Sequence, residues 1–187
     1  MKTCIFDGSL SDDKFFSRIV YLFRKHIESN NGIVDILDLK NMKIKPCLGC
    51  FGCWVKTPGE CLIKDEGQEI PKKIVSSDLF IFITPLSFGG YSSEMKKALD
   101  RCIPILLPFF RNLNGEIHHK MRYDKYPNII AFGINKDKDE NTIKSFKELI
   151  QRNSINLGAK KHIVNIIQYG EDESLLERKI SEVLEMI

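Results

Sequence analysis

The run LFIFIT at residues 79–84 most constrains the fold, because it is apolar at every position from Leu79 to Ile83. A strand that is apolar on both faces is typical of a parallel sheet covered by helices on both sides. Further strand-like runs occur at residues 2–6, 33–39, 128–134 and 162–168. Apolar residues at helical spacing fill the segments between them, so strands are predicted to alternate with helices.

The helices expected after these strands cover residues 15–27, 66–77, 92–103, 143–157 and 176–187. Pro71 is expected to shift or bend the start of the second helix, because proline fits poorly inside a helix. The segment 104–127 is expected to be irregular. These elements predict one α/β domain over residues 1–187, with five parallel strands and right-handed crossovers.

Composition excludes some partners. The chain has 187 residues and a formal net charge of +3, and its Lys and Arg residues are scattered. This pattern predicts no nucleic-acid or membrane partner, and it leaves small acidic ligands open. The N-terminal apolar run is too short for a signal peptide, and no run approaches the roughly 20 apolar residues of a membrane span. We expect a cytoplasmic protein.

The segment DGSLSDDK, residues 7–14, follows the first predicted strand, at the edge where such sheets bind ligands. Ser9 and Ser11 precede a helix whose N-terminal amides favour an anion such as phosphate, and Lys14 adds a cation. The alternative is structural, with Ser11 as a helix cap and Asp12 and Asp13 in the first turn. Their carboxylates would oppose a phosphate. A Rossmann dinucleotide site has no support, because the chain lacks G-x-G-x-x-G.

The segment TPLSFGGYSSEMKKALDR, residues 84–101, follows the central strand. The backbone around Pro85 and the pair Gly89-Gly90 can approach a flat ring closely, and Phe88 or Tyr91 can pack against it. Exposed amides there would suit the carbonyls and ring nitrogen of a flavin. The alternative is an ordinary strand-to-helix turn in which Phe88 seals the core.

This segment resembles the second flavin-binding loop and following helix of the NAD(P)H-dependent FMN reductase and iron–sulfur flavoprotein families, whose helix also carries Lys and an Asp-Arg pair. PCLGCFGCWVKTPGECLIKDE resembles the cysteine segment of the same families. The resemblance covers about residues 1–101 and implies a flavodoxin-like, doubly wound sheet with strand order 2-1-3-4-5.

The resemblance implies an FMN-dependent NAD(P)H oxidoreductase that passes electrons to a quinone, a flavin, another small-molecule acceptor or a redox protein, and that forms a homo-oligomer. Because the cofactor supplies the chemistry, no catalytic acid or base is expected. The implied flavin contacts are Ser9, Ser11, Lys14, Pro85, Leu86, Ser87, Phe88, Gly89, Gly90 and Asn135. One alternative is an electron-transfer protein with FMN and a [4Fe–4S] cluster. Another is a flavin-binding or sensor module without turnover.

Two departures from the family pattern stand out. The families usually carry GSPR followed by polar residues and Thr for the FMN phosphate, whereas this chain has GSLSDDKFFS. The Arg and the Thr are missing, so phosphate contact is the least supported part of the resemblance. Ser87 replaces a common aromatic residue, which leaves Phe88 or Tyr91 to cover the flavin.

The cysteine-rich loop, about residues 40–64, holds the candidate metal ligands. Cys47, Cys50 and Cys53 are spaced C-x2-C-x2-C, and Cys61 follows after seven residues. Four thiolates can bind a [4Fe–4S] cluster, as the resemblance implies. Zinc is less favoured, because successive knuckles would share Cys50. Structural thiols beside the flavin and a thiol redox pair remain alternatives. The isolated cysteines, Cys4 and Cys102, are expected in the core.

The insertion at about residues 104–127 has no assigned role. Adjacent His118 and His119 cannot easily chelate one ion, so hydrogen-bonded or solvated histidines are expected. Its aromatic and cationic side chains fit a lid over the cofactor or a subunit contact. These are Phe109, Phe110, Arg122, Tyr123 and Tyr126. The alternative is a surface insertion without a functional role.

Overall fold

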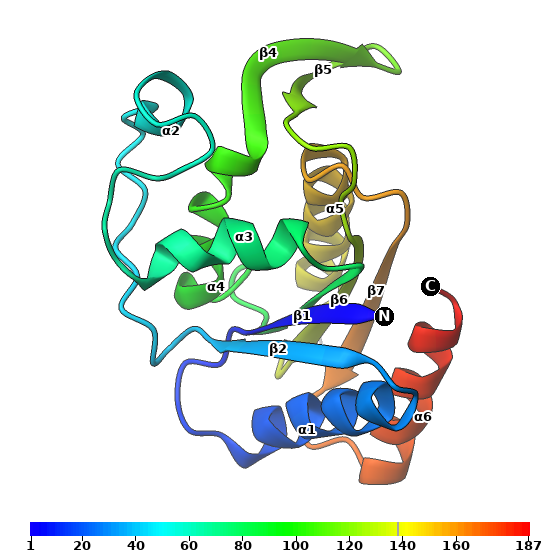
Figure 1. Cartoon of the computed structure of the whole chain (residues 1–187). Helices are drawn as coiled ribbons and strands as arrows, with labels where there is room; N and C mark the ends of the chain where they lie inside the picture. Colours follow the sequence, from blue (N-terminus) through cyan, green and yellow to red (C-terminus); the bar gives the residue numbers. More distant parts are fainter. Residues whose placement is uncertain (138) are drawn as a thin grey trace.

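The computed structural model describes residues 1–137 and 139–187. Five parallel strands form one sheet in the order β2-β1-β3-β6-β7 (Figure 1). Their bounds are β1 (Lys2–Asp7), β2 (Ile33–Asp38), β3 (Leu79–Pro85), β6 (Asn128–Asn135) and β7 (His162–Gln168). Every predicted strand is present, and the order corresponds to the predicted 2-1-3-4-5. The flavodoxin-like fold is therefore confirmed.

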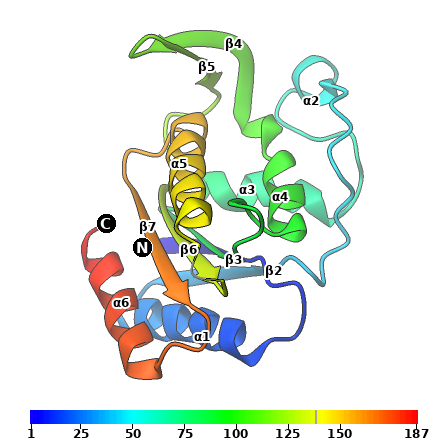
Figure 2. The same ribbon diagram turned by 180° about the vertical axis from the view of Figure 1, so that it is seen from behind.

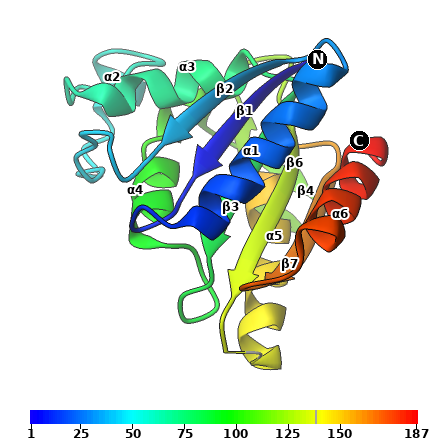
Figure 3. The ribbon, with the colours of Figure 1, turned by 90° about the horizontal axis from the view of Figure 1, so that it is seen from below.

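Helices cover both faces of the sheet (Figures 1 and 3). On one face lie α1 (Lys14–Ser29) and α6 (Glu173–Glu185), and on the other lie α3 (Glu69–Val75), α4 (Ser93–Asp100) and α5 (Glu140–Asn156). Alternate residues of β3 enter different cores: Phe80 packs beneath α3, α4 and α5, whereas Ile81 packs beneath α1 and α6. This alternation explains why the LFIFIT run is apolar throughout.

The second predicted helix begins later than expected. A 3-10 turn, η1 (Glu66–Gln68), precedes α3, and Pro71 lies in the first turn of the α-helix, where a missing N–H is tolerated. The helix expected over 92–103 likewise stops at Asp100 and is followed by η2 (Ile103–Ile105). Cys4 and Cys102 are buried, as expected.

The prediction that residues 104–127 are irregular is wrong. This segment forms an antiparallel hairpin of β4 (Leu106–Leu113) and β5 (Glu116–Met121), which extends beyond the end of α5 (Figure 2). Asn114 and Gly115 turn the chain with φ of 52° and 86°. Asn-Gly is the favoured pair for such a two-residue turn, because both residues tolerate positive φ.

Hydrogen bonds hold the hairpin to the body of the protein. Arg122 donates to the carbonyl of Pro104 (2.8 Å), and His118 lies between Asn156 (2.9 Å) and Glu116 (3.0 Å). The hydrogen-bonded state expected for His118 is thus observed. Among the described residues, no helix is both long and apolar enough to cross a membrane.

Candidate functional site

Three loops meet at the carboxyl edge of the sheet, where the strand order reverses between β1 and β3 (Figure 3). They follow β1, β3 and β6. The Gly8 N–H donates to the carbonyl of Ile83 (2.8 Å), and the Leu86 N–H donates to the carbonyl of Ile134 (2.9 Å). Each bond ties the start of one loop to the neighbouring strand. Such an edge is the usual ligand site of a doubly wound sheet.

The β1–α1 loop is closed by its own carboxylates. Asp13 caps α1 by accepting the Phe15 N–H at 2.8 Å. The expectations that Ser11 would be the cap, and that Asp12 and Asp13 would lie in the first turn, are therefore wrong. Ser and Asp are equally good caps, so the local sequence does not choose between them.

The predicted phosphate contacts of this loop differ in burial. Ser9 is buried, and its N–H donates to the Asp7 carboxylate at 2.9 Å. Ser11 and Lys14 are both exposed. Asp7 was not a predicted site residue. Its position at the end of the first strand, where such sheets bind ligands, could have indicated that it belongs to the site.

Lys40 is a second cation that the sequence analysis missed. Its ammonium lies 2.7 Å from Asp38 and 3.5 Å from Asp12. Burial opposes the shift, but the hydrogen bond to Asp38 and the charges of Asp7 and Asp12 raise the pKa of Lys40 above its ordinary value. The carboxylates at the ends of β1 and β2 thus hold this cation in place.

The β3–α4 loop contains a tight turn. Ser87 and Gly90 exchange backbone hydrogen bonds of 3.1 and 2.8 Å around Phe88 and Gly89, whose φ angles are 49° and 75°. Positive φ is uncommon for an aromatic residue and is a form of strain found at functional sites. The Phe88 side chain is fully exposed, so the alternative that it seals the core is wrong.

Tyr91 occupies the core position instead. Its ring packs edge-on against Phe82 and Phe146, and its hydroxyl accepts the Asn153 side-chain N–H at 2.6 Å. Burial raises the pKa of Tyr91 to about 12. Of the two aromatic residues expected to cover a flavin, only Phe88 is free to do so.

Asn135 ends β6 at the same edge and is 3% exposed. Its side-chain oxygen accepts the Asp137 N–H at 3.4 Å, whereas its buried amide nitrogen has no partner among the described residues. A buried donor without an acceptor is costly. A carbonyl or ring nitrogen of a bound ligand would satisfy it, so this residue fits the ring of a flavin.

All four loop cysteines line a cavity of about 270 Å³. Cys47 and Cys50 are exposed, Cys61 is half-buried and Cys53 is buried. Burial, followed by the neighbouring thiols, raises the pKa of Cys53. In the part of the chain that the structure describes, no three side chains are arranged to hold a metal ion. The cysteines thus share a cavity without forming a metal-binding geometry.

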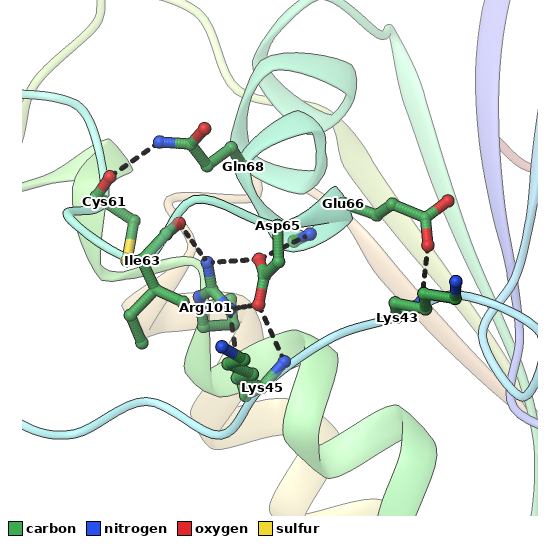
Figure 4. Close-up of polar contacts among 9 residues, drawn as sticks. Lys43, Lys45, Cys61, Ile63, Asp65, Glu66, Gln68 and Arg101 are labelled. Atoms are coloured by element: carbon green, nitrogen blue, oxygen red, sulfur yellow. Dashed lines mark hydrogen bonds and ion pairs between the residues drawn. The ribbon is translucent and has the colours of Figure 1, made fainter.

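Arg101, at the end of α4, holds the two ends of the cysteine loop together (Figure 4). Its guanidinium donates to both oxygens of Asp65 (2.8 and 3.0 Å) and to the carbonyls of Lys45 (2.8 Å) and Ile63 (3.3 Å). The side chains of Arg101 and Asp65 are 0% and 8% exposed. Together they clamp both ends of the loop against α4, in an arrangement that we call the Arg101–Asp65 clasp.

The clasp borders the cysteine cavity, because Arg101 is part of its wall. Its Nε atom is buried and has no partner in the described residues. Burial would lower the pKa of Arg101, but Asp65 and the adjacent Cys61 thiol raise it. The Asp-Arg pair at residues 100–101 drew attention to Arg101 in the sequence. Its partner Asp65 could not be predicted, because it lies far away along the chain.

Trp54, in the short helix α2 (Gly52–Val55), attaches the same loop to the hairpin. Its indole N–H donates to the carbonyl of Leu106 at 3.0 Å, and its ring packs between Phe51 and His119. A larger cavity of about 530 Å³ lies between α4, α5 and the hairpin and includes Tyr91 and His119 in its wall. This cavity was not predicted from the sequence.

A family model described as NADPH-dependent FMN reductase matches residues 1–121. The chain belongs to this family. An iron–sulfur flavoprotein of Methanocaldococcus jannaschii is 37% identical over 82 residues, which are 43% of this chain and 42% of that protein. An iron–sulfur flavoprotein of Archaeoglobus fulgidus is 30% identical over 80 residues, which are 43% of this chain and 36% of that one. The matches thus span less than half of each relative.

Solved structures share the fold of this family member over nearly its whole length. An NAD(P)H:quinone oxidoreductase from Methanothermobacter marburgensis superposes with a TM-score of 0.72 at 15% identity, covering 98% of this chain and 94% of that one. An FMN-dependent NADH-azoreductase from Bacillus anthracis, in complex with FMN, has a TM-score of 0.64 at 15% identity, covering 99% and 98%. At this identity the likeness establishes the fold alone.

Proposed function

We propose that the protein is a flavin-dependent oxidoreductase that takes electrons from NAD(P)H and passes them to a small-molecule acceptor. Family membership supports the reaction class, and the unpartnered amide of Asn135 at the carboxyl edge carries the assignment of the site. A bound flavin would supply the chemistry of hydride acceptance and electron release.

In this proposal, the chain positions the ring and shields it from water. The segment Pro85–Gly90 frames the ring, Asn135 donates to it, and Phe88 covers one side. Gly89 is needed in the turn, because its φ is 75° and an added Cβ would lie 2.7 Å from the Cβ of Ser145. The turn can therefore approach both α5 and a flat ligand.

The proposed acceptor is a quinone or an azo compound. These classes come from the names of the two structural neighbours, a quinone oxidoreductase and an azoreductase. Both are flat, electron-poor molecules that can stack on a flavin. Steady-state oxidation of NADH and NADPH with each class of acceptor would identify the preferred pair, and the absence of turnover with a flavin bound would favour a binding or sensor module.

The flavin site is tested by titrating the purified protein with flavin and following quenching of flavin fluorescence. Asn135→Ala is expected to weaken binding roughly tenfold, the effect of losing one buried hydrogen bond. Asn128→Ala is the matched control, because Asn128 lies at the opposite end of the same strand and bonds to the Lys161 N–H. Equal affinities of both variants and the wild type would contradict the assignment.

A second candidate function is electron transfer through a [4Fe–4S] cluster on Cys47, Cys50, Cys53 and Cys61. Their shared cavity and the iron–sulfur flavoproteins among the relatives support it. Four thiolates match the ligand set of such a cluster. Anaerobic purification followed by iron analysis tests it: about four irons per chain are expected, and flavin binding without iron would exclude it.

The exposed apolar side chains of the cysteine loop and the hairpin support a homo-oligomer. They are Leu48, Phe51, Val55, Phe109, Phe110 and Ile117. Apolar groups gathered on neighbouring elements are typical of protein interfaces. Light scattering after size exclusion measures the mass in solution, and a monomer at high micromolar concentration would contradict this part of the proposal.

A further inference from the structure

We propose that the β1–α1 loop accepts the neutral polyol end of a flavin and disfavours a phosphate, so that the site binds riboflavin at least as tightly as FMN. This inference rests on the proposed flavin site. It concerns only the residues Asp7 to Lys14 and their neighbours, which follow β1 at the same edge as Asn135.

Three backbone donors in and beside this loop already have acceptors within the protein. The Gly8 N–H donates to the carbonyl of Ile83, and the Ser9 N–H donates to the carboxylate of Asp7. The Asp13 carboxylate accepts the Phe15 N–H at the start of α1. A phosphate at a helix N-terminus depends on such N–H groups and on the positive end of the helix dipole. At the start of α1, the Asp13 carboxylate takes the place of such an anion.

Of the described lysines near this edge of the sheet, Lys40 and Lys136 are already engaged. Lys40 is held between Asp38 and Asp12, and Lys136 lies 4.4 Å from the centre of the Tyr169 ring. Lys14 makes no ion pair with any described residue and is exposed. A phosphate dianion would therefore approach several carboxylates, and among these three described lysines Lys14 alone would be left to compensate for them.

The same carboxylates are good acceptors for hydroxyl groups. Asp13 already accepts the hydroxyl of Tyr169 at 2.9 Å. Asp12 is 95% exposed and lies beside it in sequence, so its oxygens are open to a ligand. A carboxylate accepts from a neutral hydroxyl without charge repulsion. The ribityl chain of riboflavin carries such hydroxyls and ends in one.

The test compares riboflavin with FMN on the full-length protein by fluorescence quenching, at low and at high salt. We expect the Kd of riboflavin to be equal to or below that of FMN. Added salt should tighten FMN binding, because it screens like charges, and should leave riboflavin unchanged.

Charge removal should move the two affinities in opposite directions. Asp12→Asn with Asp13→Asn is expected to tighten FMN binding roughly tenfold. Riboflavin binding should weaken by about threefold, because the Asn oxygen still accepts a hydroxyl but without the charge of the carboxylate. Asn keeps the helix cap, and Asp13→Ser is a second variant that also keeps it. Asp172→Asn is the matched control, because Asp172 caps α6 in the same way and carries the same charge. It should change neither affinity.

Two results would overturn the inference. One is FMN binding tenfold or more tighter than riboflavin in the wild type. The other is Lys14→Ala weakening FMN but not riboflavin, which would show that the phosphate is bound at this loop. In both cases the proposed flavin function would stand. If neither flavin binds at millimolar concentration, the proposed function and this inference both fail.

Discussion

Two loops leave adjacent strands at the same edge of the sheet, and they are held in opposite ways. The β1–α1 loop is closed by residues within it or next to it: Asp7 binds Ser9, and Asp13 caps α1. The cysteine loop between β2 and η1 is held from outside, by Arg101 on α4 and by the contact of Trp54 with Leu106.

This difference predicts which property a mutation in each loop should change, ligand binding or stability. Changes in the β1–α1 loop remove exposed or locally satisfied charges, so they should alter which ligand binds. Changes at the anchors of the cysteine loop leave buried groups without partners, so they should alter stability. Measurements of unfolding and of ligand binding can separate the two cases.

The largest effect is expected from breaking the Arg101–Asp65 clasp. Asp65→Ala leaves the guanidinium buried without its counter-charge, and the free energy of unfolding should fall by about 3–5 kcal/mol. Urea unfolding followed by circular dichroism measures this change. Glu28→Ala is the control, because it removes an exposed ion pair with Arg24 and should have little effect. A loss at Asp65 no larger than that of the control would refute the role of the clasp.

The clasp should also lose its contribution in acid. Burial would raise the pKa of Asp65, but the bonds from Arg101, Lys45 and Gly67 outweigh it and lower the pKa from its ordinary value of 3.8. The stabilisation is therefore present above pH 3.8 and is lost as the pH falls through the lowered pKa of the folded state.

The stability difference between the wild type and Asp65→Asn should accordingly be constant near neutral pH and shrink below about pH 4. Urea midpoints of both proteins across this range provide the measurement. A difference that stays the same down to pH 2, or that shrinks already near pH 6, would show that another group governs the acid response.

The parts of the molecule that the sequence predicted well depend on near neighbours along the chain. The strand at 79–84 was predicted because burial on both faces requires apolar residues at successive positions, and Phe80 and Ile81 do enter separate cores. The proposed flavin contacts lie at the predicted carboxyl edge of the sheet, because the segment Pro85–Gly90 begins at the end of β3 and Asn135 ends β6. Their roles remain proposals.

The parts that were missed depend on distant partners or on equivalent local choices. Arg101 belongs to a recognised Asp-Arg pair, but only the fold brings it to Asp65 and Lys45. Capping propensity cannot separate Ser11 from Asp13. The hairpin differs from these cases, because its Asn114-Gly115 turn is a local signal that the sequence itself contains.

An intermediate effect is expected at the second anchor of the cysteine loop. Trp54→Phe keeps an aromatic ring between Phe51 and His119 but removes the N–H that bonds to Leu106. The free energy of unfolding should fall by about 1 kcal/mol, the typical value of one hydrogen bond. Circular dichroism is the probe, because the variant has no tryptophan. Proteolysis within the cysteine loop should be faster, and an unchanged cleavage rate would mean that the clasp alone holds the loop.

The smallest effect on stability is expected in the β1–α1 loop. Asp12→Asn with Asp13→Asn keeps a capping side chain at α1, so the free energy of unfolding should stay within about 0.5 kcal/mol of the wild type. The same variant is expected to change the preference between FMN and riboflavin. A loss comparable to that of Asp65→Ala would show that the carboxylates of this loop are structural anchors too, and the distinction between a ligand-selecting loop and an anchored loop would no longer hold.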